Sequence, residues 1–135
     1  MKTEYFDLKN KRALISGGAS GIGSSIVEHL CEQGVEVYFF DIDKKEAKKT
    51  INKIKKKKFK IPNFVECDIK NIKKYKLSIL NIIKKNGPID ILVNNASNDQ
   101  RHSLEKITEK YWDDRMAINL KHYLFAIQSV KKSMI

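Results

Sequence analysis

The sequence predicts an α/β fold built on a parallel sheet. Four short apolar segments alternate along the chain with segments whose apolar residues recur at helical spacing. The apolar segments lack alternating polar residues, which is typical of strands buried on both faces of a parallel sheet. A glycine-rich stretch lies between the first apolar segment and the first helical one. We expect right-handed crossovers to join strands and helices that alternate in this way.

The first strand is expected over residues 12–17, where an apolar run ends in glycine. Residues 21–33 predict a helix, because isoleucine or leucine recurs there every four residues and a glycine follows. Residues 35–40 are β-branched and aromatic, which favours a second buried strand. The chain therefore opens with a strand, a helix and a strand.

The middle of the chain continues the alternation. Residues 44–60 predict a lysine-rich helix with one apolar stripe, which consists of Ala47, Ile51 and Ile54. Residues 61–67 predict the third strand, and residues 70–85 predict the helix that follows it. Gly87 and Pro88 then separate this helix from a fourth apolar segment.

The fourth strand is expected over residues 89–95 and is followed by a polar loop over residues 96–107. Thr108 is placed to cap a long helix. The apolar face of that helix is expected to comprise Trp112, Met116, Leu120, Tyr123, Ile127 and Val130. We expect one domain over residues 1–135, a doubly wound sheet of order 3-2-1-4 that is truncated after its fourth strand and the following helix.

Composition narrows the classes of protein. Apolar residues make up 41% of the 135 residues and charged ones 32%, which is typical of a globular chain rather than a disordered one. The longest apolar runs fall short of a membrane span and the start of the chain lacks a signal peptide, so we expect a cytoplasmic protein without a membrane partner. Cys31 and Cys67 stand alone, and we expect reduced packing residues and no metal site.

The net charge of +11 raises the alternative of a nucleic-acid partner. Much of the excess lies between Lys44 and Lys60, on the outer faces of the predicted helix. Aromatic residues do not alternate with these lysines, as they would in a single-strand binding surface. We therefore favour a solvated lysine face over a nucleic-acid site.

Four of the six glycines fall within residues 17–23, between the first strand and the first helix. This is where a doubly wound, Rossmann-like sheet binds pyrophosphate with backbone N–H groups at a helix N-terminus. Gly17 would permit the tight turn, Gly21 the close approach of the backbone to the ligand, and Gly23 the packing of the helix. The hydroxyls of Ser16, Ser20 and Ser24 could add donors.

Asp41 ends the second strand, 18 residues after Gly23. A carboxylate at this position can accept both ribose hydroxyls of an adenosine and would repel a 2′-phosphate, which favours NAD over NADP. The alternative is a helix N-cap, and Asp43 is equally well placed for that task.

These residues carry a family resemblance. The stretch from Ser16 to Gly23, SGGASGIG, resembles the TGxxxGxG fingerprint of the short-chain dehydrogenase/reductase family. The resemblance continues through Cys67-Asp68, through NNAS at residues 94–97, and to Asn119 in MAINL. The motifs follow the order and spacing of that family over nearly the whole chain.

The resemblance implies a nicotinamide cofactor and a role for each motif. It implies that Asp68 contacts the adenine ring and that Asn94, Asn95 and Ala96 line the cofactor. It further implies that Asn119 is the helix asparagine of a catalytic tetrad, where it holds a water in a proton relay. Two further motif residues, Ile22 and Ile69, are also expected at the cofactor. Helix capping by Asp68, strand-end hydrogen bonding by the asparagines and an ordinary polar position for Asn119 are the structural alternatives.

The loop over residues 97–105 would lie beside the nicotinamide end of the site. Its NDxRH pattern resembles family members that act on sugars and polyols. Polar groups on Asn98, Gln100 and His102 would suit a hydroxyl-rich small molecule. A solvated loop explains the same residues.

The family also uses a tyrosine, a lysine four residues later and a serine, and we expect these beyond the present chain. Tyr5 and Lys9 have the spacing but precede the first strand. We therefore expect the cofactor-binding half of an oxidoreductase that is inactive alone and that either self-associates or pairs with a C-terminal half. The alternative is a non-catalytic nucleotide-binding or interaction remnant.

Overall fold

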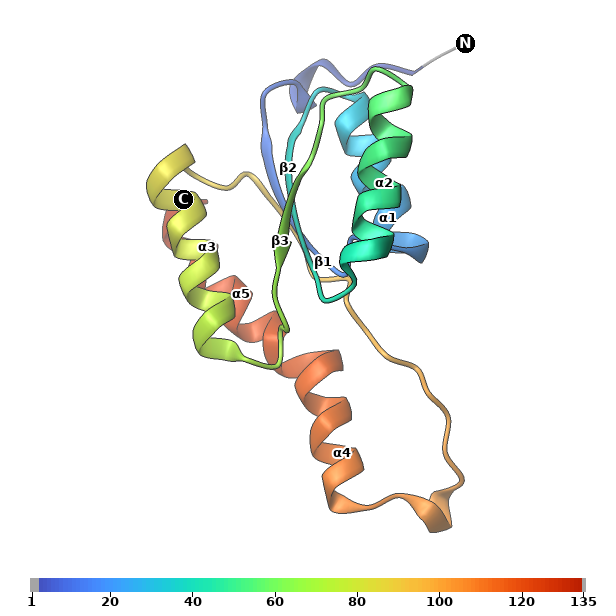
Figure 1. Ribbon diagram of the computed structural model, residues 1–135. Coiled ribbons are helices and arrows are strands. Elements are labelled where there is room, and N and C mark those ends of the chain that lie inside the picture. Colours follow the sequence, from blue (N-terminus) through green and yellow to red (C-terminus); the bar gives the residue numbers. More distant parts are fainter. Residues whose placement is uncertain (1–2, 135) are drawn as a thin grey trace.

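The computed structural model describes residues 3–134, in which the strands form one parallel sheet (Figure 1). The strands are β1 (Arg12–Ser16), β2 (Glu36–Asp41), β3 (Asn63–Glu66) and β4 (Ile91–Val93). They lie in the order β3-β2-β1-β4. The α/β class and the parallel, doubly wound arrangement agree with the sequence-based prediction. The direction of winding reverses at β1, and its carboxyl end is therefore where a crevice is expected.

The central strand β1 is the most buried part of the sheet. Its residues Ala13, Leu14 and Ile15 are fully buried and pair with β2 on one side and β4 on the other. The ladder with β4 is shorter than predicted and ends at Val93. It ends there because the N–H of Asn95 donates to the side chain of Ser16 instead of a strand carbonyl.

Two pairs of helices cover the two faces of the sheet (Figure 1). The helices α1 (Gly21–Glu32) and α2 (Lys44–Lys56) pack on one face, and α3 (Ile72–Asn86) and α5 (His122–Val130) pack on the other. A further helix, α4 (Glu109–Met116), extends away from the sheet and reaches α5 through a π-helical turn. Single 3-10 turns lie at Phe6–Leu8, Leu104–Lys106 and Lys131–Ser133.

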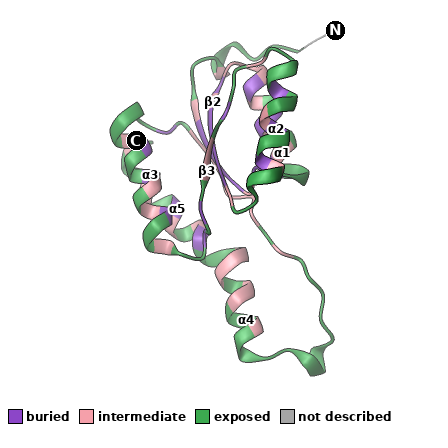
Figure 2. Ribbon diagram, in the orientation of Figure 1, coloured by how far each residue is buried: buried purple, intermediate pink, exposed green. Residues whose placement is uncertain are grey.

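Each face of the sheet has its own hydrophobic core, and Figure 2 shows the buried residues along the sheet and the inner sides of the helices. Neighbouring side chains of β2 point to opposite faces. Phe39 packs in the core with α1 and α2, while Phe40 packs edge-to-face with Tyr75 of α3 at 5.0 Å between ring centroids. Cys31 and Cys67 are buried with free thiols, one in each core.

The predicted apolar stripe of α1 is wrong at its first position. Ile22 is 77% exposed, and the side of α1 that faces the sheet consists of Gly23, Val27, Glu28 and Cys31. A strict four-residue repeat advances by about 40° per step around a helix, so it drifts off any single face. Gly23 takes the inner position because a side chain there would clash with the backbone of Gly17.

The predicted face of the last helix is also largely wrong. Val130 is buried, but Trp112, Leu120 and Ile127 are each about half exposed, at 59%, 55% and 49%. The buried residues of α5 are instead His122, Ala126 and Val130. The π-helical turn Ala117–Lys121 explains the error, because a turn with i→i+5 bonding rotates all later side chains relative to α4.

Two lysines of the lysine-rich helix are not merely solvated. Lys53 and Lys57 of α2 both pair with Glu28, a residue of α1 that is only 8% exposed. Their hydrogen bonds hold the pKa of the Glu28 carboxyl below its usual value. This pair of contacts fastens α2 to α1.

Replacing Glu28 with glutamine should lower the free energy of unfolding by about 1 kcal/mol at neutral pH. The contribution is present above the unfolded pKa, near 4.5, and disappears as the pH falls through the lowered folded pKa. Urea unfolding at pH 7 and pH 3 measures both effects. Glu46→Gln is the matched control, since its i,i+3 pair with Lys49 is exposed and should contribute a few tenths of a kcal/mol. Equal losses in the two variants would contradict the assignment.

Candidate functional site

The carboxyl ends of the strands open onto a cleft of about 550 Å³. Its walls come from the turn after β1, the end of β2, the segment after β3 and the chain between β4 and α5. Another hollow, of about 620 Å³, lies on α1 and is lined by that helix alone. Of these two hollows, only the cleft at the strand ends brings together residues from several strands, so we take this cleft as the candidate site.

The glycine-rich turn forms the floor of the cleft. Gly17 and Gly21 have φ angles of +71° and +54°, in the left-handed region that favours glycine. A Cβ on Gly21 would meet no atom within 4 Å, so the backbone at this position is open to the outside. A Cβ on Gly23 would lie 1.8 Å from the carbonyl oxygen of Gly17. The turn is thus closed on its inner side and open at Gly21. Gly17 and Gly23 line the cleft, while Gly21 borders the hollow on α1.

Gly18 is a requirement that the sequence analysis missed. A Cβ there would lie 2.6 Å from Cβ of Phe39 on β2. The turn is also fixed to β2 by the N–H of Gly17, which donates to the carbonyl of Phe40 at 2.8 Å. Gly18 is therefore needed for the packing of the turn against the sheet.

The predicted hydroxyl donors separate into two kinds. Ser16 is buried, and its Oγ accepts the N–H groups of Asn95 and Ala96 at 3.0 and 3.1 Å. It also lies 3.1 Å from Nε2 of His122, so the prediction that Ser16 serves as a phosphate donor is wrong. Ser20 is exposed, lines the cleft and makes no capping bond with its side chain. The hydroxyl of Ser24 donates to the carbonyl of Gly21.

Asp41 lies on the cleft wall at the end of β2. One carboxylate oxygen accepts the N–H of Ala19 in the glycine-rich turn at 2.9 Å, and the other accepts those of Ile42 and Asp43. The helix-cap alternative is taken by Asp43, whose side chain accepts the N–H of Glu46. Asp41 is thereby oriented by the backbone and left beside the cleft.

Asp68 and Ile69 line the same cleft after β3. The carboxylate of Asp68 accepts the N–H of Lys70 at 2.9 Å, while Asn71 caps α3. The capping alternative for Asp68 therefore goes to Asn71. Ile69 is 8% exposed and contributes an apolar wall.

The three residues after β4 lie at the carboxyl end of the sheet with different surroundings. The amide of Asn95 donates to the carbonyls of Ser16 and Gly17, each at 3.0 Å, so it holds the glycine-rich turn in place. Asn95 and Ala96 line the cleft. Asn94 is not among the cleft-lining residues, and its Oδ1 is buried without a hydrogen-bond partner in the described part of the chain.

Asn119 lies in the π-helical turn and holds the loop that follows β4. Its Oδ1 accepts the N–H of Asn98 at 2.7 Å, and its Nδ2 donates to the carbonyl of Asn98 at 3.0 Å. Asn98 lines the cleft and Asn119 does not. The structure thus brings Asn119 to the site through its contact with Asn98.

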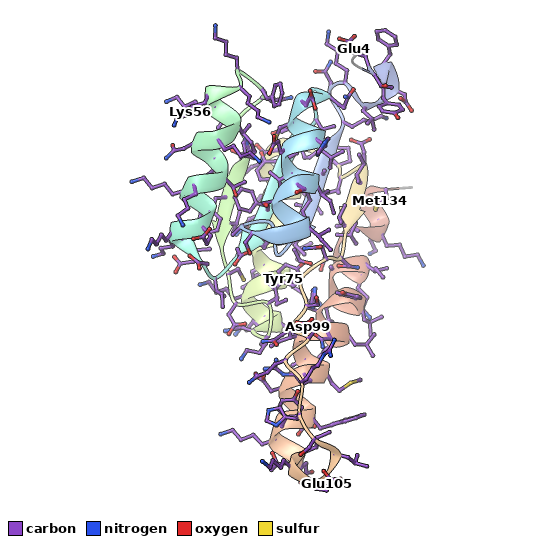
Figure 3. The ribbon with its side chains drawn as sticks, turned by 90° about the vertical axis from the view of Figure 1, so that its right-hand side faces the viewer. Glu4, Lys56, Tyr75, Asp99, Glu105 and Met134 are labelled. Atoms are coloured by element: carbon purple, nitrogen blue, oxygen red, sulfur yellow. The ribbon has the colours of Figure 1, made fainter. Side chains whose placement is uncertain are left out.

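The rest of the predicted substrate loop extends away from the sheet beside α4 (Figures 1 and 3). Tyr111 of α4 donates to the carbonyl of Gln100, and the ring of His102 lies 4.2 Å from that of Tyr111. In Figure 3, Asp99 lies near the sheet and Glu105 at the far end. Glu4, beside Tyr5, lies at the opposite end of the molecule, which places the Tyr5–Lys9 spacing far from the cleft.

His122 is a buried group that the sequence analysis did not single out. Burial lowers the pKa of His122, so the ring is neutral at neutral pH. Nε2 of His122 lies within hydrogen-bonding distance of Ser16 Oγ, which also accepts two N–H groups, while Nδ1 is buried without a hydrogen-bond partner in the described part of the chain. No local signal marks this contact, since 106 residues separate the partners.

The model of the short chain dehydrogenase family matches residues 11–135. The chain belongs to this family. Within residues 3–134, this short-chain dehydrogenase has no helix with the length and apolar character that are needed to cross a bilayer.

Three proteins illustrate the similarity. D-xylose 1-dehydrogenase of Caulobacter vibrioides is 38% identical over 130 residues, which are 96% of this chain and 50% of that protein. The aldohexose dehydrogenase of Thermoplasma acidophilum, solved in ligand-free form, is 30% identical with a TM-score of 0.81. The match covers 96% of this chain and 46% of that one. A blue fluorescent protein from a metagenomic library, solved with NADPH, is 28% identical with a TM-score of 0.84. The match covers 94% of this chain and 52% of that one.

This short-chain dehydrogenase chain spans about half the length of the curated relatives that it matches. The portion shared with them contains the glycine-rich turn, the cleft and the loop after β4. The matches show the family and the fold of this chain.

Proposed function

We propose that this chain is the cofactor-binding domain of an NAD-dependent oxidoreductase that transfers hydride between the nicotinamide and an alcohol or carbonyl carbon. The observation that carries the proposal is the Asp41 carboxylate, which lies on the cleft wall and is hydrogen-bonded to the glycine-rich turn. A carboxylate at this place favours the two free ribose hydroxyls of NAD over the 2′-phosphate of NADP. The residue that follows is Ile42 rather than a basic one.

The residues present fit such a cofactor. A Cβ at Gly21 would point into open space, and backbone N–H groups of a turn before a helix suit pyrophosphate. We propose that the turn binds the pyrophosphate with Gly17, Ser20, Gly21, Ile22 and Gly23, and that Asp68 and Ile69 contact the adenine. Asn94, Asn95 and Ala96 would lie toward the nicotinamide, which supplies the hydride chemistry when bound.

Asn119 is proposed to act near the reaction through the loop that it holds. Its two hydrogen bonds to Asn98 fix the backbone where that loop leaves the cleft. A hydroxyl-rich substrate, a sugar or polyol, is proposed because polar residues follow Asn98 and because the relatives named above include xylose and aldohexose dehydrogenases. The cytoplasm is the proposed compartment.

The cofactor proposal is tested by replacing Asp41 with alanine. The loss of hydrogen bonds to a charged acceptor should weaken NADH binding by about tenfold to a hundredfold, and NADPH binding much less. Titration calorimetry with both cofactors gives the two dissociation constants. Asp43→Ala is the matched control, because it also removes a carboxylate that accepts a backbone N–H but lies outside the cleft lining. Unchanged preference for NADH in Asp41→Ala would overturn the NAD assignment.

We also propose that the chain associates with a copy of itself or with a complementary C-terminal half. The side chains of Trp112, Leu120 and Leu124 are each more than half exposed, on α4 and α5 and the turn between them. Sedimentation velocity should show a concentration-dependent dimer. Leu120→Glu should raise the dissociation constant of this dimer by about tenfold. Lys110→Glu, an exposed position of α4, is the control. A monomer at all concentrations would contradict self-association.

The rival proposal is a non-catalytic nucleotide-binding remnant. It is favoured by Asn119, which does not line the cleft itself and whose side-chain oxygen and nitrogen both bond to Asn98. Turnover separates the two. The purified 135-residue chain is expected to bind NADH without oxidising or reducing sugars, and to gain activity only with a polypeptide that supplies a tyrosine–lysine pair. Binding without any such gain would favour the remnant.

A further inference from the structure

A network of charged side chains lies at the mouth of the cleft, where the segment after β3 meets α4. Lys70 donates to Asp114 at 3.0 Å, and Arg115 pairs with the other carboxylate oxygen of Asp114. All three residues line the cleft. Because Lys70 follows Asp68 by two residues and Asp68 accepts its N–H, the network lies at the Asp68 end of the site.

Arg115 has hydrogen-bonding capacity that its neighbours do not use. Its side chain is 18% exposed, and the Nε and Nη1 groups are buried without a hydrogen-bond partner among residues 3–134. Its guanidinium carbon lies 5.3 Å from the centroid of the Tyr111 ring. Buried donors that stay unpaired are costly, and a cleft-lining arginine with two of them suits a ligand that brings acceptors.

Asp114 fixes the orientation of this guanidinium. Hydrogen bonds from Lys70 and Arg115 lower the pKa of the Asp114 carboxyl, so it is ionised at neutral pH. The same contact raises the pKa of the Lys70 ammonium group. The network therefore bridges α4 and the segment after β3 and holds Arg115 on the cleft wall.

The chemistry of the network suits a neutral base. Asp114 pairs with both Lys70 and Arg115, so its carboxylate already offsets part of the positive charge that a phosphate would need. Adenine is neutral, offers ring nitrogens as acceptors and has a flat face on which a planar guanidinium can stack. Both features match the unused N–H groups and the position beside Asp68 and Ile69.

We propose that Arg115 is a further cofactor-binding residue, which contacts the adenine base through its free N–H groups and its planar face. This inference rests on the proposed function, because it assigns a role within the same cleft. Arg115 then contributes to the adenosine half of the cofactor and contributes nothing to the nicotinamide half.

The test measures the binding of NADH, ADP-ribose and nicotinamide mononucleotide to the purified protein by calorimetry. Arg115→Ala should weaken the binding of NADH and of ADP-ribose by about tenfold. It should leave the binding of nicotinamide mononucleotide unchanged. Arg115→Lys keeps the charge but lacks the planar fork, and should recover less than half of the loss in binding free energy. Arg101→Ala removes an exposed arginine of the loop and is the matched control. Thermal melting checks that each variant is folded.

The outcomes separate this inference from the proposed function. If the wild-type protein binds NADH and ADP-ribose and Arg115→Ala binds them equally well, the role of Arg115 is overturned and the cofactor site stands. Full recovery by Arg115→Lys would also overturn the base contact, because charge alone would then suffice. If the wild-type protein binds neither ligand, the proposed function itself falls.

Discussion

Replacing Gly23 with alanine is expected to destabilise the fold by about 3 kcal/mol or more and to abolish NADH binding. The added Cβ would lie 1.8 Å from the carbonyl oxygen of Gly17 and 2.8 Å from its carbonyl carbon. Both are backbone atoms, and Asn95 ties the same carbonyl to the end of β4. The clash therefore displaces the turn and α1 together, rather than one flexible side chain.

Gly21→Ala separates the two consequences. Its Cβ would meet nothing within 4 Å, and the cost to folding is the left-handed φ of +54°, roughly 1 kcal/mol. We expect this variant to fold and to lose NADH affinity, because the proposed site brings the pyrophosphate against the backbone at this glycine. Chemical unfolding and calorimetry measure the pair. Equal destabilisation by the two alanines, or full binding by Gly23→Ala, would contradict the assigned packing.

The fold was predictable because the signals for it are local. The apolar runs predict the strands and the glycines around Gly17 predict the first turn, and both depend on neighbours in the sequence. The strands and the parallel sheet were therefore correct, while the order of the strands followed from the alternation of strands and helices that is typical of a doubly wound sheet. The inner faces of α1 and α5 were not, because helical periodicity alone cannot show that Gly23 faces the sheet or that a π-helical turn rotates the chain before His122.

The candidate site was predictable in its residues and less so in their contacts. Asp41 and Asp68 line the cleft as the motifs indicate. The buried position of Ser16 depends on Asn95 and His122, which are 79 and 106 residues away. Contacts over such separations follow from the packing of the sheet, so no window of sequence contains them.

His122 is expected to make the stability of the protein fall as the pH falls below about 7. Burial lowers its folded pKa below the unfolded value, near 6.5. Below that value the imidazole is protonated in the unfolded chain but stays neutral in the folded chain. The free energy of unfolding therefore falls as the pH falls. The slope is at most about 1.4 kcal/mol per pH unit, for one proton, and ends at the lowered folded pKa.

His122→Gln removes the titration and keeps a polar side chain that can hydrogen-bond to Ser16. The ring of His122 packs against those of Tyr75 and Tyr123, so the variant should lose about 1–3 kcal/mol of stability at pH 7. Its stability should then be nearly flat from pH 7 to pH 5, where urea unfolding of the wild type shows the decline. His29→Gln, at an exposed position of α1, should keep the wild-type slope. A His122→Gln protein that retains the full slope would show that another group refuses the proton, and the buried pair with Ser16 would no longer explain the acid sensitivity.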